Sequence, residues 1–266
     1  MSNEPFIPTL FKRFFWTLLD YILKFMIVSF LWFLFHLPVF YFLLILFISH
    51  VTHIYLYWGA FLIIIFSPVS FGAAYYVLQI ASQYFTSDRL SLFHRVEDAS
   101  GIKLGVFFKG MGKYLSHSAL LILLNLILSF FLYVNVWFYW TVILPRVQII
   151  GLFLTGIIFW AIILYVLSLF YLVPIILLKK LNVFKAFYQS LLLVIDNIFY
   201  TLSNGVFLLS FLFIMVLTVA GLGLIFFGAF MLFQILATLV LYQKYDETLQ
   251  IRDERRTLKN IIKPWD

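Results

Sequence analysis

The sequence predicts an all-α, polytopic membrane protein with six transmembrane helices arranged as three hairpins. Its 266 residues are 65% hydrophobic and only 11% charged, against about a quarter charged in an ordinary soluble domain. Apolar runs such as 25–48 and 118–139 exceed the ~20 residues that a helix needs to cross ~30 Å of hydrocarbon. They also lack the alternating pattern of the ~10-residue strands in a membrane β-barrel. These observations indicate helices that cross a bilayer.

The first hairpin is predicted from two apolar stretches separated by a short polar segment. The first stretch, 21–48, follows the basic residues Lys12 and Arg13. It is too long for the apolar region of a signal peptide, which has about 7 to 15 residues, so it is expected to remain in the mature protein. The second stretch, 54–83, ends where a polar loop begins.

The other two hairpins follow the same pattern. The second is predicted at 114–140 and 147–178, with Pro145 and Arg146 in the turn, and the third at 197–219 and 222–242. These boundaries can be off by a few residues. A charged tail, 243–266, completes the chain after this single transmembrane domain; it is expected to form a short surface helix, with an interaction tail as the alternative.

Basic residues lie almost entirely on one side of this arrangement. The short turns 49–53, 141–146 and 220–221 face one side, and the long loops 84–113 and 179–196 face the other together with both termini. Of the 18 lysine and arginine residues, only Arg146 lies on the short-turn side. Because basic residues concentrate in cytoplasmic loops, both termini are predicted to be cytoplasmic. The net charge of +7 therefore reflects membrane topology and not binding to nucleic acid.

A basic and aromatic segment stands before each predicted hairpin. The three segments centre on Phe11-Lys12, Phe108-Lys109 and Phe184-Lys185. They suggest a threefold repeat in which each hairpin is introduced by a segment that lies along the membrane interface. The alternative is coincidence, since the chain contains 34 phenylalanines.

Two ionisable residues near the apolar stretches are candidates for function. His36 lies near the middle of the first helix, at a depth where such groups are costly and often functional. The structural alternative is a neutral His36 that hydrogen-bonds a neighbouring helix, or the Leu34 carbonyl that Pro38 leaves without its amide partner. Asp196 lies at the inner end of the fifth helix, where a role as its N-cap is expected.

Three prolines fall inside predicted helices. Pro38, Pro68 and Pro174 each remove one intrahelical hydrogen bond and can open a kink. Kinked helices line cavities in transporters, although single prolines are also ordinary features of membrane helices. We therefore keep these positions as candidates for a pathway and, equally, for packing.

The sequence offers no residues for an enzymatic or cofactor-dependent reaction. It contains no cysteine, which excludes disulfides and thiolate chemistry. His50 and His53 have a metal-like spacing, but a zinc site needs three or four ligands. Gly105 and Gly110 have the spacing of a phosphate-binding loop, but Met111 follows where lysine is required. We expect no catalytic residues, no cofactor and no metal site.

Several segments together resemble the YesL-like family of uncharacterised bacterial membrane proteins. They are Ser67-Pro68-Val69-Ser70, Ala73-Ala74-Tyr75, Phe107-Phe108-Lys109, Val173-Pro174 and Phe184-Lys185-Ala186-Phe187. The resemblance covers 11–242, although the loop 85–106 is longer than the family's usual turn. Family members are often encoded beside carbohydrate ABC-transporter components, which implies an accessory role in solute uptake and a place in the bacterial cytoplasmic (inner) membrane. No catalytic or binding residue is carried over.

Two functions remain open at this stage. The leading expectation is a non-enzymatic membrane protein that assists or assembles with another membrane system, such as an ABC-type permease. The alternative is a small-solute transporter or solute-binding subunit in its own right, with a pathway among the three proline-containing helices. A lipid-handling enzyme is the least favoured, because its chemistry needs clusters of ionisable residues.

The topology can be tested by labelling introduced cysteines, since the chain has none of its own. His50→Cys should react with an impermeant thiol reagent added outside, because it lies in a short outer turn. Arg95→Cys should react only from the cytoplasmic side. Labelling of both from one side would contradict the predicted arrangement.

Overall fold

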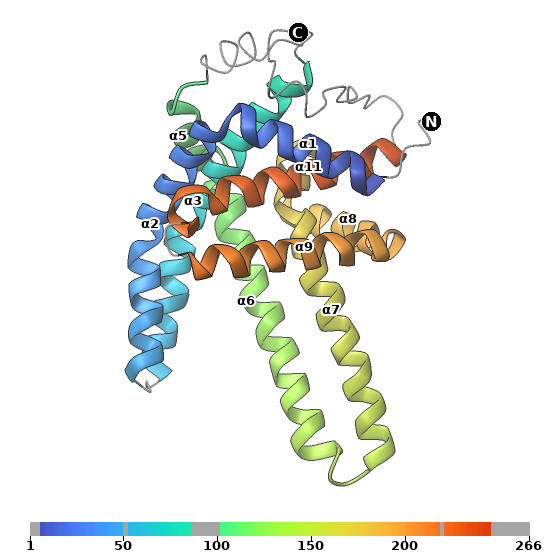
Figure 1. The fold of residues 1–266 in the computed structure, drawn as a ribbon. Coiled ribbons are helices and arrows are strands. Elements are labelled where there is room, and N and C mark those ends of the chain that lie inside the picture. Colours follow the sequence, from blue (N-terminus) through green and yellow to red (C-terminus); the bar gives the residue numbers. More distant parts are fainter. Residues whose placement is uncertain (1–5, 50–52, 87–101, 219–220, 246–266) are drawn as a thin grey trace.

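The computed structural model describes residues 6–49, 53–86, 102–218 and 221–245. Every regular element within these ranges is a helix (Figure 1). Six of them are long and apolar enough to cross a membrane, which confirms the predicted α-helical, multi-pass class. His50, Arg95 and the tail after Tyr245 lie outside the described residues.

Three pairs of long helices follow one another along the chain. The first pair is α2 (Ile22–Ser49) and α3 (His53–Thr86). The second is α6 (Leu115–Phe138), which continues into the π-helix η1 (Tyr139–Ile143), and α7 (Gln148–Lys179). The third is α9 (Ile198–Leu217) and α11 (Phe227–Tyr245), with the π-helix η2 (Leu222–Phe226) between them. When η1 is counted with α6 and η2 with α11, the predicted helices match these bounds to within three residues at either end.

A shorter helix precedes each pair: α1 (Phe6–Asp20), α5 (Gly105–Lys113) and α8 (Val183–Asp196). Each carries one of the basic and aromatic segments, so the repeat noticed in the sequence corresponds to a repeated unit of a short helix and a helical pair. Helix α8 begins at Asn182, whose side chain accepts the Lys185 amide at 2.9 Å and caps the helix. It buries Val183 and exposes Phe184 and Tyr188 on the other side.

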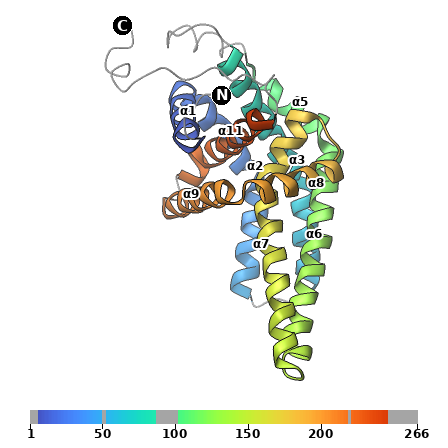
Figure 2. The same ribbon diagram turned by 90° about the vertical axis from the view of Figure 1, so that its right-hand side faces the viewer.

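The three pairs do not share one direction. Helices α2, α3, α6 and α7 run roughly alongside one another, whereas α9 and α11 run across them (Figures 1 and 2). Helices α1, α11 and α9 lie one beneath the other, with α11 in the middle (Figure 1). This layering explains why 78% of the most apolar stretch of α11 is buried within the chain, against 6% for α6.

Aromatic side chains join these three layers. The Phe11 ring of α1 lies edge-on to the Phe207 ring of α9, with centroids 4.7 Å apart. Phe233 of α11 contacts Phe207 at 4.7 Å and Phe14 of α1 at 5.4 Å. Edge-on and tilted pairs of this kind stabilise by about 0.5–1.5 kcal/mol beyond the area they bury. The cluster fixes α11 between the other two helices.

Helix α5 packs on α3 through two glycines. A Cβ atom at Gly110 would lie 2.9 Å from the Tyr75 Cβ and 3.1 Å from the Gly72 Cα. A Cβ at Gly72 would lie 2.8 Å from the Phe107 carbonyl oxygen. The two backbones can approach this closely only because neither residue has a side chain. The glycine at Gly110 is therefore explained by helix packing.

This contact predicts opposite effects for two glycines of the same helix. Gly110→Ala should lower stability by about 1–3 kcal/mol, because the added methyl group overlaps Tyr75 and Gly72. Gly112→Ala should be neutral or stabilising by up to about 1 kcal/mol, since its Cβ would meet nothing within 4 Å and alanine favours the helix. Thermal unfolding in mild detergent measures both; equal effects would contradict the packing.

Candidate functional site

His36 packs within its own helix. Its Nδ1 lies 2.8 Å from the Trp32 carbonyl oxygen, and its ring stacks on the Trp32 indole with centroids 4.6 Å apart. The carbonyl can only accept, so Nδ1 carries the proton in this contact. The structural alternative predicted from the sequence was a bond to another helix or to the Leu34 carbonyl, and that choice of partner was wrong. The acceptor belongs to Trp32, one turn before His36, because stacking on the Trp32 indole holds the imidazole over that turn.

The link between helices at this position is made by Trp32. Its indole N–H donates to the Ser70 hydroxyl of α3 at 2.9 Å, and its ring stacks on Phe227 of α11 with centroids 4.3 Å apart. An indole N–H buried among apolar groups needs such an acceptor. Trp32 therefore connects α2 with both α3 and α11, and His36 supports its position.

The three prolines lie inside helices that continue through them. Pro38 is in α2, Pro68 in α3 and Pro174 in α7. Pro68 cannot donate to the Ile64 carbonyl, and the neighbouring Ser67 hydroxyl donates to that oxygen instead at 2.8 Å. The side chains of Pro68 and Pro174 are buried, whereas Pro38 is exposed. The Ser67 hydroxyl thus replaces the hydrogen bond that Pro68 cannot make.

Asp196 does not cap α9 as the sequence analysis expected. It is the last residue of α8, and Asn197 occupies the N-cap position of α9. The Asp196 carboxylate accepts the Tyr245 hydroxyl at 2.9 Å. The Asn197 amide donates to the same Tyr245 oxygen at 2.7 Å, and Lys244 donates to the Asn197 side-chain oxygen at 3.0 Å. These exposed groups tie the end of α11 to the corner between α8 and α9.

A buried polar cluster, which the sequence analysis missed, lies between α1, α7 and α9. It consists of Arg13, Tyr171, Tyr200, Thr201 and Asn204. Tyr171, Thr201 and Asn204 are each 0% exposed, and Arg13 is 3% exposed. Polar groups enclosed among apolar helices are costly unless they find partners, so such a cluster is the first place to look for function.

The hydroxyls of the cluster form a chain of hydrogen bonds. Thr201 donates to the Asn197 carbonyl at 2.9 Å, so Tyr171 donates to the Thr201 oxygen, also at 2.9 Å. The chain leads from buried Tyr171 to the exposed corner at Asn197. Asn204 lies close to the side chains of Tyr171 and Tyr200. Neither of its amide atoms makes a hydrogen bond of good geometry within the described part of the chain, although both tyrosine hydroxyls lie near enough to interact with the amide.

Arg13 enters the cluster from α1. Its guanidinium donates to the Gln243 side chain at 3.3 Å and lies near enough to Tyr200 to interact with it electrostatically. A signal for this position was present in the sequence. Leu10, Arg13, Phe14 and Thr17 share the spacing of one helical face, and all four are buried. Arg13 therefore belongs to the buried face of α1 and is not only a charge on the cytoplasmic side.

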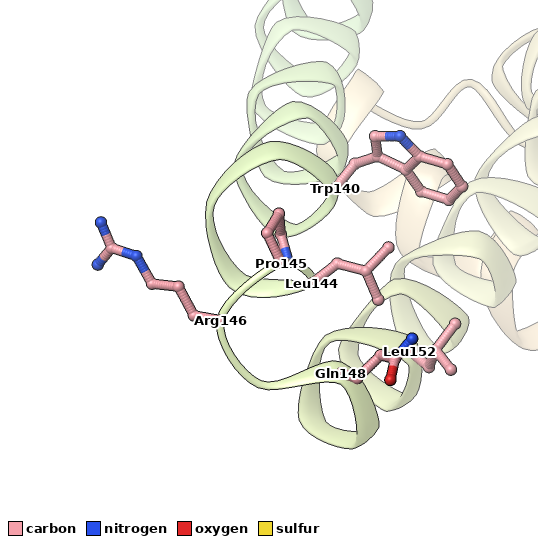
Figure 3. Close-up of a pocket in the computed structure, with 6 residues that line it drawn as sticks. All are labelled: Trp140, Leu144, Pro145, Arg146, Gln148 and Leu152. Carbon is pink, nitrogen blue, oxygen red and sulfur yellow. The ribbon is translucent and has the colours of Figure 1, made fainter.

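Two open hollows on the surface lie away from this cluster. One is at the tip of the α6–α7 hairpin, where Arg146 points away from the other lining side chains (Figure 3). Its lining residues are Trp140, Leu144, Pro145, Arg146, Gln148 and Leu152. Another lies along the exposed side of α8 beside Phe184, Lys185 and Tyr188. The polar cluster is part of the packed interior.

No family model matches the chain, and no similar protein was found among curated proteins or solved structures. The candidate site therefore rests on the contacts described above. The resemblance to the YesL-like family stays a prediction.

The cluster predicts opposite effects for two neighbouring substitutions in α9. Thr201→Val should lower stability by about 1–3 kcal/mol, because it leaves the buried Tyr171 hydroxyl without its acceptor. Asn204→Leu should raise stability by about 1 kcal/mol or more, because it replaces an unpaired amide with an apolar group of similar size. Thermal unfolding in detergent measures both. A destabilised Asn204→Leu variant would mean that the amide is paired in the folded protein.

Proposed function

We propose that this chain is a non-enzymatic protein of the bacterial cytoplasmic (inner) membrane, with both termini inside, that assembles with or assists another membrane protein. The partner class we favour is a solute transporter, such as the ABC-type permease of a carbohydrate system. The observation that carries this proposal is the position of Trp160 on the uncovered α6–α7 hairpin.

The hairpin is suited to cross the bilayer with its tip at one interface. Trp137 and Trp140 lie near the tip and are 55% and 60% exposed, and Arg146 is in the turn itself. Tryptophan and arginine anchor helices at the boundary between hydrocarbon and water. At the other end, Lys113 and Lys179 lie at the ends of α5 and α7. These anchors place the apolar middle of the hairpin in the hydrocarbon.

Trp160 is exposed where an interface anchor is not expected. It lies twelve residues after Gln148, the first residue of α7, and nineteen before Lys179, the last. At ~1.5 Å per residue these separations are about 18 and 28 Å, so Trp160 lies well inside a ~30 Å hydrocarbon layer. Its side chain is 58% exposed. Lipid chains offer no acceptor for an indole N–H, whereas a helix of a partner protein does. Exposed tryptophans of this kind often contribute most of the energy of an interface.

A transporter acting alone is the second candidate, and the buried polar cluster is the observation that favours it. An unpaired amide beside an arginine and two tyrosines is a set of groups that could bind a polar solute. His36 supports this alternative less, because its ring already bonds and stacks within α2. The first candidate therefore depends on Trp160, and the second depends on the buried polar cluster.

Partner binding tests the first candidate. When the tagged chain is purified from its own membranes in mild detergent, a membrane protein should accompany it in fixed ratio. Trp160→Phe should weaken this association several-fold, since a hydrogen bond within a membrane contributes about 1 kcal/mol. Trp137→Phe, a similarly exposed control near the hairpin tip, should leave it unchanged. Equal effects of the two variants would remove the basis of the proposal.

Reconstitution tests the second candidate. We expect the purified protein in liposomes to move no common sugar or amino acid by itself, and His36→Leu to retain partner binding. For a proton-coupled carrier that used His36 as its midplane ionisable group, His36→Leu should abolish pH-dependent uptake. Robust uptake by the purified wild-type chain would favour the transporter, and its loss in His36→Leu would identify this residue.

A further inference from the structure

The two ends of α9 lie at nearly the same distance from the basic side of the protein. This distance can be counted along α7 from Lys179, at the end of that helix, and along α2 from Lys24, near the beginning of that helix. At its beginning, Thr201 is bonded to Tyr171 of α7, which lies eight residues before Lys179, or about 12 Å along the helix. Beyond its other end, a Cβ at Gly223 would lie 3.4 Å from the Phe33 ring of α2. Phe33 lies nine residues after Lys24, or about 14 Å along α2.

A helix that crossed the bilayer would show a much larger difference. The 20 residues of α9 span about 30 Å, whereas its two ends differ by only about 2 Å on this scale. The middle of α9 agrees, because Phe207 contacts Phe11 of the short helix α1. The ribbon shows the same relation, with α9 lying across α6 and α7 (Figure 1).

Helix α11 also stays near the basic side. At its beginning, the Gly228 amide donates to the Ser29 hydroxyl at 2.8 Å, five residues or about 8 Å from Lys24 along α2. Near its other end, the Lys179 ammonium lies 4.0 Å from the centre of the Tyr242 ring. The helix therefore rises by about 8 Å over a length of about 21 Å.

The outer face of α9 is mainly apolar, with Ser203 and Ser210 as its exposed polar residues, and the rest of the described chain does not cover it. Its exposed apolar residues recur at helical spacing: Phe199, Leu202, Val206, Leu209 and Phe213. Helix α9 contains no charged residue, unlike a helix that rests among lipid headgroups. Helix α9 packs directly on α7, where a Cβ at Gly205 would lie 3.7 Å from the Leu167 side chain. Hydrocarbon that surrounds α7 would therefore extend to α9.

We propose that α9 and α11 lie within the leaflet on the basic side instead of crossing the bilayer, and that acyl chains of this leaflet cover the exposed face of α9. Helices α2, α3, α6 and α7 then make four crossings. Both termini remain on one side of the membrane, because four crossings, like six, are an even number. The one-sided distribution of lysine and arginine is therefore kept. The turn around Gly221 lies on the inner side of the membrane centre, and not outside as the sequence predicts.

Cysteine labelling distinguishes the two arrangements in the full-length protein. In sealed vesicles, Arg146→Cys should react with an impermeant thiol reagent from the outer side, and Lys185→Cys only from the inner side. Thr218→Cys, at the end of α9, should not react from the outer side. Its labelling from the same side as Arg146→Cys would overturn the proposal.

Depth measurements provide a second test that does not depend on reactivity. Spin labels attached at Phe199→Cys, Val206→Cys and Phe213→Cys should report similar depths in liposomes of phosphatidylcholine and phosphatidylglycerol. A steady change of depth along the three positions, through the centre of the bilayer, would show that α9 crosses it and would refute the proposal.

The same variants identify what covers α9. A fluorophore at Val206→Cys should be strongly quenched by phosphatidylcholine with brominated acyl chains, as expected for direct lipid contact. Disulfide crosslinking between copies through Val206→Cys, or loss of quenching when a partner co-purifies, would show that protein covers this face and would overturn lipid as the occupant. Neither result depends on the proposed role in assembly.

Discussion

Helix α11 is apolar on every side, and a helix of this kind has to be enclosed by other helices or by lipid. In this chain other helices enclose it: α1 and α9 lie above and below, and α2, α3 and α7 contact it from the side. The closest approach is at Gly228, where a Cβ would lie 2.8 Å from the Phe25 carbonyl oxygen. The placement of the short helix α1 and the crosswise direction of α9 both follow from the need to cover α11.

The polar groups of this interior are satisfied in two ways that have different consequences. Several hydroxyls donate to a backbone carbonyl close by in their own chain segment, as Ser67 and Thr201 do. Such bonds do not position one helix against another. Trp32 and Tyr171 instead donate to another helix. Because apolar contacts between helices are tolerant of small shifts, these directional bonds determine how α2 meets α3 and how α7 meets α9.

Length and hydropathy were enough to predict the six long helices, because the ~20 apolar residues needed to cross a membrane leave a strong local signal. They were not enough to predict the direction of α9 and α11, since an apolar sequence does not distinguish a helix that runs alongside its neighbours from one that runs across them. The N-cap at Asn197 was misplaced by one residue for a related reason. The Asn197 side chain bonds Lys244 and Tyr245, which are nearly fifty residues away in the sequence.

The enclosure of α11 also explains where its polar contacts occur. A helix surrounded by apolar neighbours can make strong directional contacts at little cost only near its ends, where water or polar side chains can reach it. At its last turn, Gln243 bonds Arg13 of α1, and Lys244 and Tyr245 bond the corner between α8 and α9. Three successive residues thus fix the central helix lengthwise against both layers that cover it. Arg13 is buried in α1, and from this position its guanidinium reaches the last turn of the central helix.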